Sequence, residues 1–188
     1  ALKNKVAAII VNYNMPERTD ALVEYINTNV KWPVHVIVVD NGSDIAEPSK
    51  YTTVRLEQNV QTTRGWLAGL DYVGDDYLAY WFIITSAEFV GGDPLTPMCE
   101  KLILDQDAVG IHPALTKDST THWTHMQATG MQGCRPTWMI DNIASLYLAD
   151  WFNSIGRFDP ALIYAWGIDL ETCYKARQDK RLLYICED

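Results

Sequence analysis

The chain has 188 residues, of which 48% are hydrophobic and 21% are charged, and its formal net charge is −9. Such a chain is long enough to bury one substantial core and short enough to form a single domain. Its acidity excludes the basic surface with which proteins grip nucleic acids or anionic membranes, and no apolar run reaches the roughly 18 residues that span a bilayer.

The cysteines and the first residues bear on the cellular compartment. Cys99, Cys134, Cys173 and Cys186 are widely spaced and form no CxxC pair, so we predict free thiols in a reducing compartment, two or more of them as plain core residues. The opening segment, ALKNKVAAIIVNYN, lacks the small-residue cleavage site of a signal peptide. The sequence therefore predicts a cytoplasmic protein without a transmembrane segment.

Apolar runs alternate with amphipathic segments through the first half of the chain. Short continuous apolar runs indicate strands buried on both faces, and apolar residues at helical spacing indicate the helices that cover them. The predicted strands are VAAIIV (6–11), VHVIVVD (34–40), TVRLE (53–57) and YLAYWFII (77–84). The predicted helices are RTDALVEYINTNV (18–30) with Thr19 or Asp20 as N-cap, RGWLAGLDYV (64–73) presenting Trp66, Leu70 and Val73, and PLTPMCEKLIL (94–104).

The second half of the chain is less regular. Residues 110–138 hold turn formers and aromatics with little periodicity, which is typical of a binding loop. A strand and a short helix are predicted within NIASLYLADWFNSIG (142–156), where Gly156 ends the helix. The order of elements predicts one α/β domain over residues 1–188, a three-layer α/β/α sandwich with a mostly parallel sheet.

Polar side chains follow several of the predicted strands. Ligands of open α/β sheets bind beyond the carboxyl ends of the strands, so we expect residues 12–14, Asp40 and residues 85–88 to border one cleft. The ring of Tyr13 can stack on a planar base, and the carboxylate of Asp40 can accept the imide N–H of a uracil-type ring. The alternatives are a half-buried loop aromatic and a turn-forming aspartate before Asn41 and Gly42.

Three segments resemble the family 2 glycosyltransferases, which are inverting nucleotide-sugar enzymes with a GT-A fold. They are AAIIVNYNMPE (7–17), VIVVDNGSD (36–44) and SIGRFDPALIYAWGIDLETCYKARQDKRLLYI (154–185). The resemblance runs in order over nearly the whole chain. It implies a nucleotide-binding half at 1–106, an acceptor and catalytic half at 107–188, and a nucleotide-sugar donor, most simply a UDP-sugar.

The resemblance also implies roles for individual residues of the donor site. Val11, Asn12 and Tyr13 would contact the nucleotide, and Asp40 would hydrogen-bond its base. Arg64, at the start of a predicted helix, would lie near phosphate or base; the alternative is an ordinary surface arginine.

In the relatives, an acidic pair at the start of a late helix supplies the catalytic base. Here the pair is reduced to Asp169, because Ile168 stands where another acid is common. Inverting transfer needs a carboxylate that takes the proton of the acceptor hydroxyl, which makes Asp169 the candidate base. Asp also simply starts helices well, which is the alternative. Trp166 and Asp141 are predicted to bind the acceptor, which is an unknown glycan, lipid or small molecule.

The metal motif of the family is altered. Residues 85–88 read Thr-Ser-Ala-Glu where the relatives carry metal-binding aspartates, so Glu88 is the candidate ligand for Mn²⁺ or Mg²⁺. Mg²⁺ often takes only one or two protein carboxylates together with phosphates, and Asp93 or Asp141 can add to Glu88. The relatives also supply a histidine after the final strand; if the natural protein continues past Asp188, that ligand lies outside this sequence.

Other candidate metal ligands and other functions are weaker. Asp75 and Asp76 precede their strand and read as a solvated turn, and the pair His122 and His125 has no third ligand at a persuasive spacing. A protein of the same fold that binds UDP without transferring a sugar is the main alternative function. A dinucleotide-dependent Rossmann enzyme is disfavoured because no GxGxxG motif follows the first strand.

Overall fold

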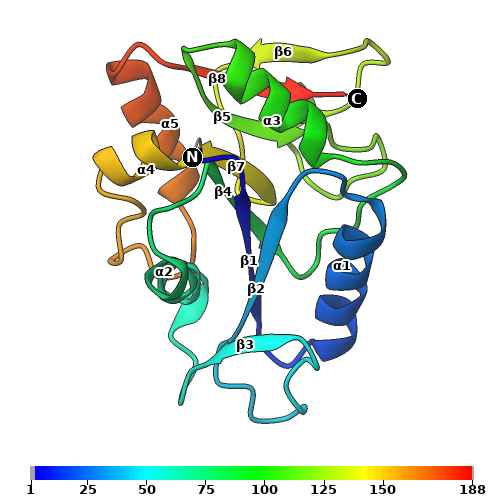
Figure 1. The fold of residues 1–188 in the computed structure, drawn as a ribbon, viewed down its shortest axis with the longest axis vertical. Coiled ribbons are helices and arrows are strands. Elements are labelled where there is room, and N and C mark those ends of the chain that lie inside the picture. Colours follow the sequence, from blue (N-terminus) through cyan, green and yellow to red (C-terminus); the bar gives the residue numbers. More distant parts are fainter. Residues whose placement is uncertain (1–2, 188) are drawn as a thin grey trace.

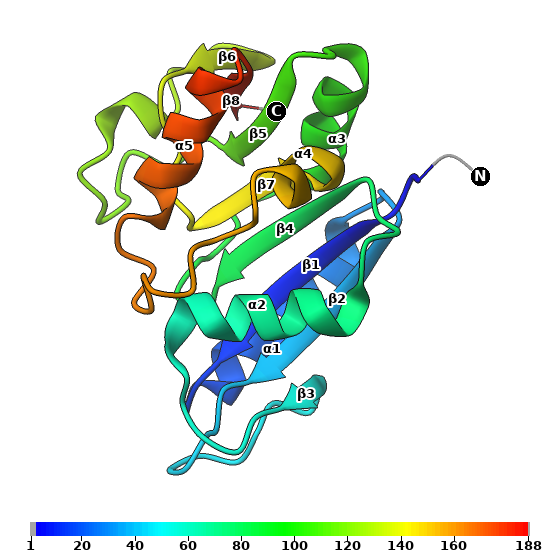
Figure 2. The same ribbon diagram turned by 90° about the vertical axis from the view of Figure 1, so that its left-hand side faces the viewer.

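The computed structural model describes residues 3–187, which form a single eight-stranded mixed sheet (Figures 1 and 2). The strand order is β3-β2-β1-β4-β7-β5-β8-β6, with β1–β4 parallel to one another, β5 parallel to β8, and β6 and β7 antiparallel to their neighbours. The strands are β1 (Val6–Asn12), β2 (Val34–Asp40), β3 (Thr52–Arg55), β4 (Ala79–Ile84), β5 (Ala108–Pro113), β6 (Cys134–Thr137), β7 (Ala144–Leu148) and β8 (Leu182–Cys186).

Helices cover both faces of the sheet and enclose two apolar cores. One face carries α1 (Pro16–Asn29) and α3 (Leu95–Leu104); the other carries α2 (Gln61–Val73), α4 (Ala149–Ser154) and α5 (Ile168–Gln178). Figure 2 shows α2, α4 and α5 in front of the strands. A 3₁₀ turn, η1 (Thr124–Met126), lies in the long loop after β5. The predicted three-layer α/β/α sandwich is confirmed. Within residues 3–187, no helix has the length and apolar character to cross a bilayer.

The first helix begins earlier than its sequence pattern suggests. Pro16 occupies its first turn, where the missing proline N–H costs nothing because helix-starting N–H groups have no partner within the helix. Thr19 is therefore inside the helix and fully buried, and its hydroxyl donates to Asn12 Oδ1 at 3.0 Å. The prediction of Thr19 or Asp20 as N-cap is wrong because both residues lie within the helix.

The segment 110–138 is more ordered than its sequence predicts. It begins within β5 and contains β6, and both strands pair with β8 near the end of the chain. The sequence Cys-Arg-Pro-Thr of β6 has no alternating pattern, so its pairing partner alone makes it a strand. Between β5 and β6, residues 114–133 form the irregular loop that was expected.

Two of the four cysteines are not free. Cys134 of β6 and Cys186 of β8 face each other in register and form a disulfide, so the prediction of free thiols is wrong for this pair. Cys99 and Cys173 are free and buried, as expected of core residues, and burial raises the pKa of both thiols. Disulfides persist mainly in oxidising environments, so the cysteines no longer support a reducing compartment.

Reduction of this disulfide is expected to lower the free energy of unfolding by about 2–4 kcal/mol, because the bond closes a long loop in the unfolded chain. The bonded cysteines are 52 residues apart. Urea unfolding with and without dithiothreitol measures the loss, and a Cys134→Ser/Cys186→Ser variant should show it without reductant. A Cys99→Ala variant is the control, since its unfolding should keep the same sensitivity to reductant. Equal unfolding midpoints for oxidised and reduced wild-type protein would contradict the expectation.

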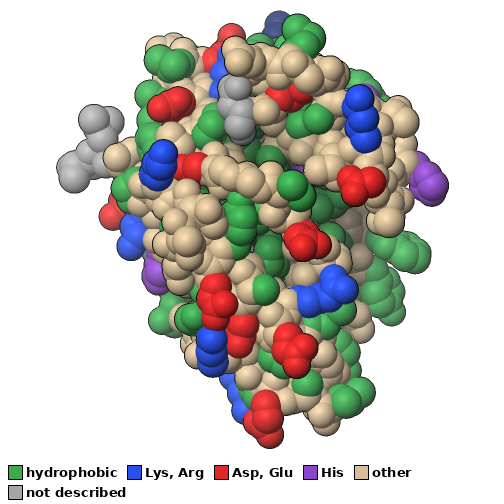
Figure 3. Space-filling model, turned by 90° about the vertical axis from the view of Figure 1, so that its right-hand side faces the viewer, with side chains coloured by type: hydrophobic (Ala, Val, Ile, Leu, Met, Phe, Trp, Pro, Cys, Tyr) green, Lys and Arg blue, Asp and Glu red, His purple; other side chains and the backbone are tan. Residues whose placement is uncertain are grey.

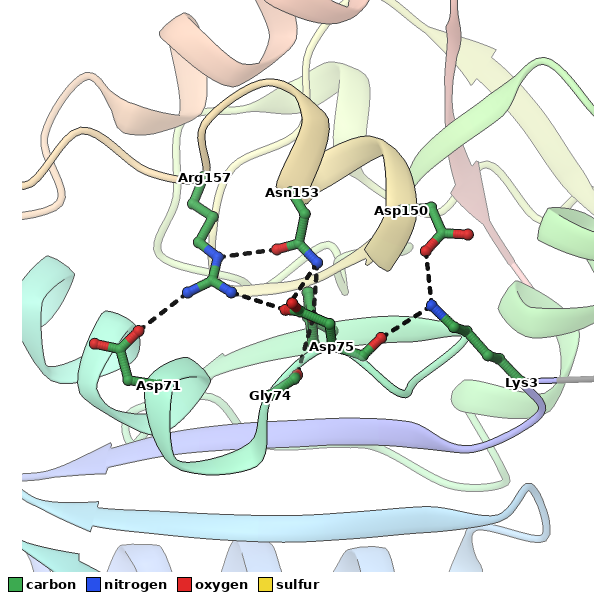
Figure 4. Close-up of polar contacts among 8 residues, drawn as sticks. Lys3, Asp71, Gly74, Asp75, Asp150, Asn153 and Arg157 are labelled. Carbon is green, nitrogen blue, oxygen red and sulfur yellow. Dashed lines mark hydrogen bonds and ion pairs between the residues drawn. The ribbon is translucent and has the colours of Figure 1, made fainter.

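A cluster of ion pairs and hydrogen bonds lies at the amino ends of β1 and β4 (Figure 4). This is the end of the sheet opposite the predicted ligand-binding cleft. Arg157 contacts Asp75 at 2.9 Å and Asp71 at 3.1 Å, and its Nε donates to Asn153 Oδ1. Lys3 donates to the Asp75 carbonyl oxygen at 3.0 Å. Asp75 is thus an exposed residue between α2 and β4, as expected of a solvated turn, and its contacts join this turn to α4 and to Arg157, which follows α4.

Candidate functional site

A cleft of about 250 Å³ lies at the carboxyl ends of β1 and β4, on the face covered by α2. We call it the first cleft. Its walls combine apolar, hydroxyl and amide side chains, and no charged side chain among residues 3–187 lines it. An uncharged planar group such as a nucleobase suits these walls. The lining residues are Val11, Tyr13, Met15, Asn41, Asn59, Gln61, Thr62, Trp66, Ile83, Ile84 and Thr85.

Val11 and Tyr13, two predicted nucleotide-binding residues, line this cleft. Tyr13 is 37% exposed, and its hydroxyl donates to Asp44 Oδ1 at 3.2 Å. Asn14 adopts a positive φ of 55° and accepts hydrogen bonds from three successive backbone N–H groups, those of residues 44–46. These contacts fix the loop after β2 against the ring of Tyr13.

Asn12 and Asp40, also predicted to bind the nucleotide, lie behind the cleft and do not line it. Both side chains are fully buried and hydrogen-bond each other, from Asn12 Nδ2 to Asp40 Oδ1 at 3.0 Å. The carboxylate also accepts the N–H of Ser43 at 3.2 Å and its hydroxyl at 2.6 Å. Asp40 therefore holds the turn after β2, which agrees with the turn-forming alternative.

Asn41 lines the cleft in the place expected for Asp40. Its Nδ2 donates to Asn59 Oδ1 at 3.0 Å, and its Oδ1 accepts the N–H of Val60 at 2.9 Å. The next residue, Gly42, has φ +68°, and any Cβ there would collide with the backbone of Gln58. The Asn-Gly pair marks a turn in the sequence, but only the folded chain brings residues 58–61 against it.

The start of α2 is tied to the loop that precedes α5. Thr63 is fully buried; its hydroxyl donates to Leu162 O and accepts the N–H of Ala165 at 3.0 Å. Arg64 is exposed, and its Nε donates to Pro160 O at 3.1 Å. Arg64 does not line the first cleft, and sequence patterns gave no sign of the role of Thr63. Together the two residues hold the loop 160–166 beside the first cleft.

Asp169 lies in the first turn of α5, whose N-cap is Gly167 at φ 89°. The preceding Ile168 is fully buried and anchors the helix, whereas Asp169 is half-buried. Within the described part of the chain, its carboxylate accepts no hydrogen bond and forms no ion pair. Glu171 instead pairs with Lys175 at 2.8 Å. Asp169 thus offers a carboxylate that the fold does not use.

Two more predicted residues, Trp166 and Asp141, belong to this part of the molecule. Trp166 is 84% exposed, with its ring 6.4 Å from that of Tyr164. Asp141 accepts a hydrogen bond from Trp123 Nε1 at 2.8 Å. Burial raises the pKa of Asp141, and the nearby charge of Asp169 raises it further. The structure therefore places two carboxylates close together near the start of α5.

Glu88 lies apart from this group. It is exposed and lines a second cleft of about 590 Å³, which opens toward the α1 and α3 face together with Phe89, Thr116 and Cys186. Figure 3 views the molecule from this side, where a hollow separates the upper and lower parts. Glu88 is thus not among the residues that line the first cleft, although Ile84 at the end of β4 lines both clefts.

The residues around the first cleft do not fit a divalent metal. Across residues 3–187, no group of three or more His, Cys, Asp or Glu side chains is placed to hold a metal ion. Mg²⁺ and Mn²⁺ prefer carboxylate, carbonyl and water oxygens, and the first cleft contributes no carboxylate. His125 bonds Met139 O, and its ring lies 4.9 Å from that of Trp138 in a tilted arrangement, which explains it without a metal.

His112, in the wall of the second cleft, links β5 to β7. Its Nε2 accepts the N–H of Ala144 at 2.9 Å, and its Nδ1 contacts Pro113 O at 2.6 Å. Burial lowers the pKa of His112 to about 4, against the smaller opposing effect of the Pro113 carbonyl. The neutral ring is therefore the form that fits the folded protein.

Acidification is expected to lower the free energy of unfolding by about 3 kcal/mol, because His112 takes up a proton more readily in the unfolded chain. Its folded pKa is depressed below the ordinary value near 6.5, so the unfolded chain binds the proton first. The contribution is complete above pH 6.5 and is lost as the pH falls from 6.5 to 4. Urea unfolding over this range measures it, with His112→Gln expected to flatten the profile and His122→Gln, at an exposed position, to leave it unchanged. A parallel decline in wild type and His112→Gln would refute the assignment.

No protein-family model and no curated protein sequence matches this chain. Several solved structures match it in fold. The structure of GalNAc-T7 with UDP, GalNAc and Mn²⁺ covers 98% of this chain and 43% of the GalNAc-T7 chain, with a TM-score of 0.76 and 13% sequence identity. The mannosyltransferase PcManGT from Pyrobaculum calidifontis, in complex with GDP-Man and Mn²⁺, covers 100% of this chain and 57% of its own chain, with a TM-score of 0.70 and 12% sequence identity. Residues 1–349 of TarS from S. aureus cover 98% of this chain and 58% of the TarS chain, with a TM-score of 0.68 and 14% sequence identity.

The present chain thus spans less than two thirds of each of these chains. Their shared architecture is the mostly parallel sheet between two helical layers, and it extends over nearly all of residues 1–188. The chain has the GT-A fold.

Proposed function

We propose that this protein is a glycosyltransferase that moves a sugar, with inversion, from a UDP-linked donor to an acceptor hydroxyl. The observation that supports the proposal is an unengaged carboxylate, that of Asp169, at the start of a helix whose preceding loop is bonded to the start of α2. Thr63 ties the loop before α5 to the start of α2, and α2 forms one wall of that cleft. A base and a nucleotide pocket at one sheet edge are what the reaction needs.

In this proposal, the nucleobase lies in the first cleft against Tyr13, between the ends of β1 and β4. The amides of Asn59 and Gln61 offer hydrogen bonds to its edge. Asp169 takes the proton of the acceptor hydroxyl as that oxygen attacks the anomeric carbon, and the nucleoside diphosphate leaves from the opposite side. Trp166, Tyr164 and Asp141 form the acceptor side.

If a divalent cation takes part, the phosphates of the nucleotide would have to supply most of its ligands. Such a cation would supply positive charge to the departing diphosphate. Glu88 would be its ligand from this chain, but that side chain lies in the second cleft. We therefore assign no catalytic step to the metal.

A nucleotide-binding protein of the same fold that transfers no sugar is the second candidate function. It is favoured by the missing carboxylate at the end of β4 in the first cleft, because an acidic protein has few other means of stabilising the leaving diphosphate.

Titration calorimetry with UDP, with and without Mn²⁺, combined with an assay of UDP release from UDP-sugars, tests both functions. UDP binding with sugar release supports the transferase, and UDP binding alone, across a panel of donors and acceptors, supports the second candidate. Absence of UDP binding would refute both. A Glu88→Gln variant is the matched control for Mn²⁺: a Mn²⁺ effect that this variant abolishes would restore Glu88 as a ligand.

A further inference from the structure

The loop 160–166, which leads into α5, is hydrogen-bonded to the rest of the molecule at one place. Within residues 3–187, every hydrogen bond between this loop and a residue outside 159–167 comes from Thr63 or Arg64, at the start of α2. Figure 2 shows the loop, in orange, reaching that end of α2. The position of the loop therefore depends on two adjacent residues of a helix that borders the first cleft.

Thr63 makes three of these four hydrogen bonds. It is fully buried, its N–H donates to Ile163 O at 3.2 Å, and its hydroxyl donates to Leu162 O. The same hydroxyl accepts the N–H of Ala165 at 3.0 Å. Ala165 has a φ of 65°, and a residue other than glycine keeps such a conformation only where its surroundings fix it. Thr63 supplies such a constraint from inside the protein.

The residues just before Thr63 belong to the wall of the first cleft. Gln61 and Thr62 line the cleft. Gln61 O accepts a hydrogen bond from Asn41 Nδ2 at 3.3 Å, and Gln61 N–H donates to Asn59 Oδ1 at 2.8 Å. Both asparagines also line the cleft. A ligand in the first cleft would therefore hold the helix start that carries Thr63 and suppress its local opening.

The loop carries groups that the proposed function places on the acceptor side. The rings of Tyr164 and Trp166 are exposed on it. It then passes through Gly167 into the first turn of α5, where Asp169 lies. A shift of the loop would move these rings and the start of α5 relative to the first cleft, and misplacement of catalytic groups by about 1 Å can cost a factor of about 100 in rate.

We propose that Thr63 is a positioning residue, which couples the nucleotide site in the first cleft to the loop 160–166. The inference rests on the proposed function, because it takes UDP to bind in the first cleft. Thr63 itself does not line that cleft, and its side chain is buried. A bound nucleotide stabilises the start of α2, and the hydroxyl of Thr63 passes this stabilisation to the loop.

Amide hydrogen exchange of residues 161–166, with and without saturating UDP, tests the coupling. In wild type, UDP should slow exchange in the loop about 5-fold or more. Thr63→Val keeps the shape of the side chain and removes its hydroxyl. UDP should still bind to this variant, but the slowing should fall below about twofold. Thr63→Ser keeps the hydroxyl and should restore the slowing.

Thr96→Val is the matched control, because it makes the same chemical change at the start of α3, on the opposite face of the sheet. The hydroxyl of Thr96 donates to Asp93 Oδ2 at 2.6 Å. Its loss should lower the melting temperature and leave the effect of UDP on the loop intact. A role of Thr63 in stability alone would make the two variants behave alike.

Arg64→Gln provides a second variant if Thr63→Val fails to fold. It removes the other tether, from Arg64 Nε to Pro160 O, at an exposed position. The slowing of loop exchange by UDP should become smaller in this variant. An effect of UDP equal to that in wild type would then count against the coupling.

Sugar transfer gives an independent readout. Thr63→Val should lower kcat about 10-fold to 100-fold with little change in the donor KM, and Thr63→Ser should transfer nearly as wild type does. Loop protection by UDP that Thr63→Val abolishes and Thr63→Ser restores supports the proposal. UDP binding without a change in loop exchange, or equal protection in wild type and Thr63→Val, would overturn it. Absence of UDP binding to wild type would refute the proposed function and, with it, the coupling.

Discussion

Replacing Asp169 with asparagine is expected to reduce sugar transfer by about 10²–10⁴-fold, the usual contribution of a general base. An amide of the same shape cannot take a proton from the acceptor hydroxyl. UDP binding should stay within about twofold of wild type, because Asp169 does not line the first cleft. Steady-state kinetics of UDP release, together with calorimetry of UDP binding, measures both quantities.

Glu171→Gln is the matched control, because it makes the same chemical change two residues further along α5. Glu171 pairs with Lys175 on the surface of the helix, so its loss should leave the transfer rate nearly unchanged. A transfer rate for Asp169→Asn equal to wild type would show that another group, most directly Asp141, is the base. A loss of UDP binding in Asp169→Asn would show instead that the side chain holds the donor.

Asp40→Ala is expected to destabilise the protein by about 3–5 kcal/mol, the usual effect of removing one partner from a buried charged network. Three donors lose their acceptor in the interior: Asn12 Nδ2, the Ser43 N–H and the Ser43 hydroxyl. The nearest cation, Arg55, lies 3.7 Å from the carboxylate and is exposed, so it remains solvated. Urea unfolding, compared with wild type, measures the change.

Asp44→Ala provides the control in the same loop. Asp44 is exposed and accepts hydrogen bonds from Tyr13 and Asn14 at the surface, where water replaces lost contacts. Its removal should cost much less stability. The comparison also decides the role that the sequence predicts for Asp40. A stable Asp40→Ala protein that fails to bind UDP would make Asp40 a base contact after all; a strongly destabilised one would confirm its place in the turn.

The first half of the fold was readable from the sequence because its strands are buried on both faces. Such strands appear as unbroken apolar runs, and the run 34–40 coincides with β2. The apolar spacing of residues 64–73 likewise predicted α2, with Trp66 and Leu70 buried. The later edge of the sheet was not readable, since β6 has no pattern of its own and exists through its pairing with β8.

The candidate site was also predictable from the sequence only in part. The sequence by itself determined that Tyr13, Asp40 and Glu88 follow strands that end at one sheet edge, because parallel strands share their direction. Only the tertiary structure decided which of these side chains enter the first cleft. Tyr13 does. Asp40 turns inward to bond Asn12 and Ser43, and Glu88 lines the second cleft. For Asp40 and Tyr13 the reason is that hydrogen-bond partners fix the direction of the side chain, and two of these partners, Asn12 and Asp44, lie at or after the end of a different strand from the residue they bond.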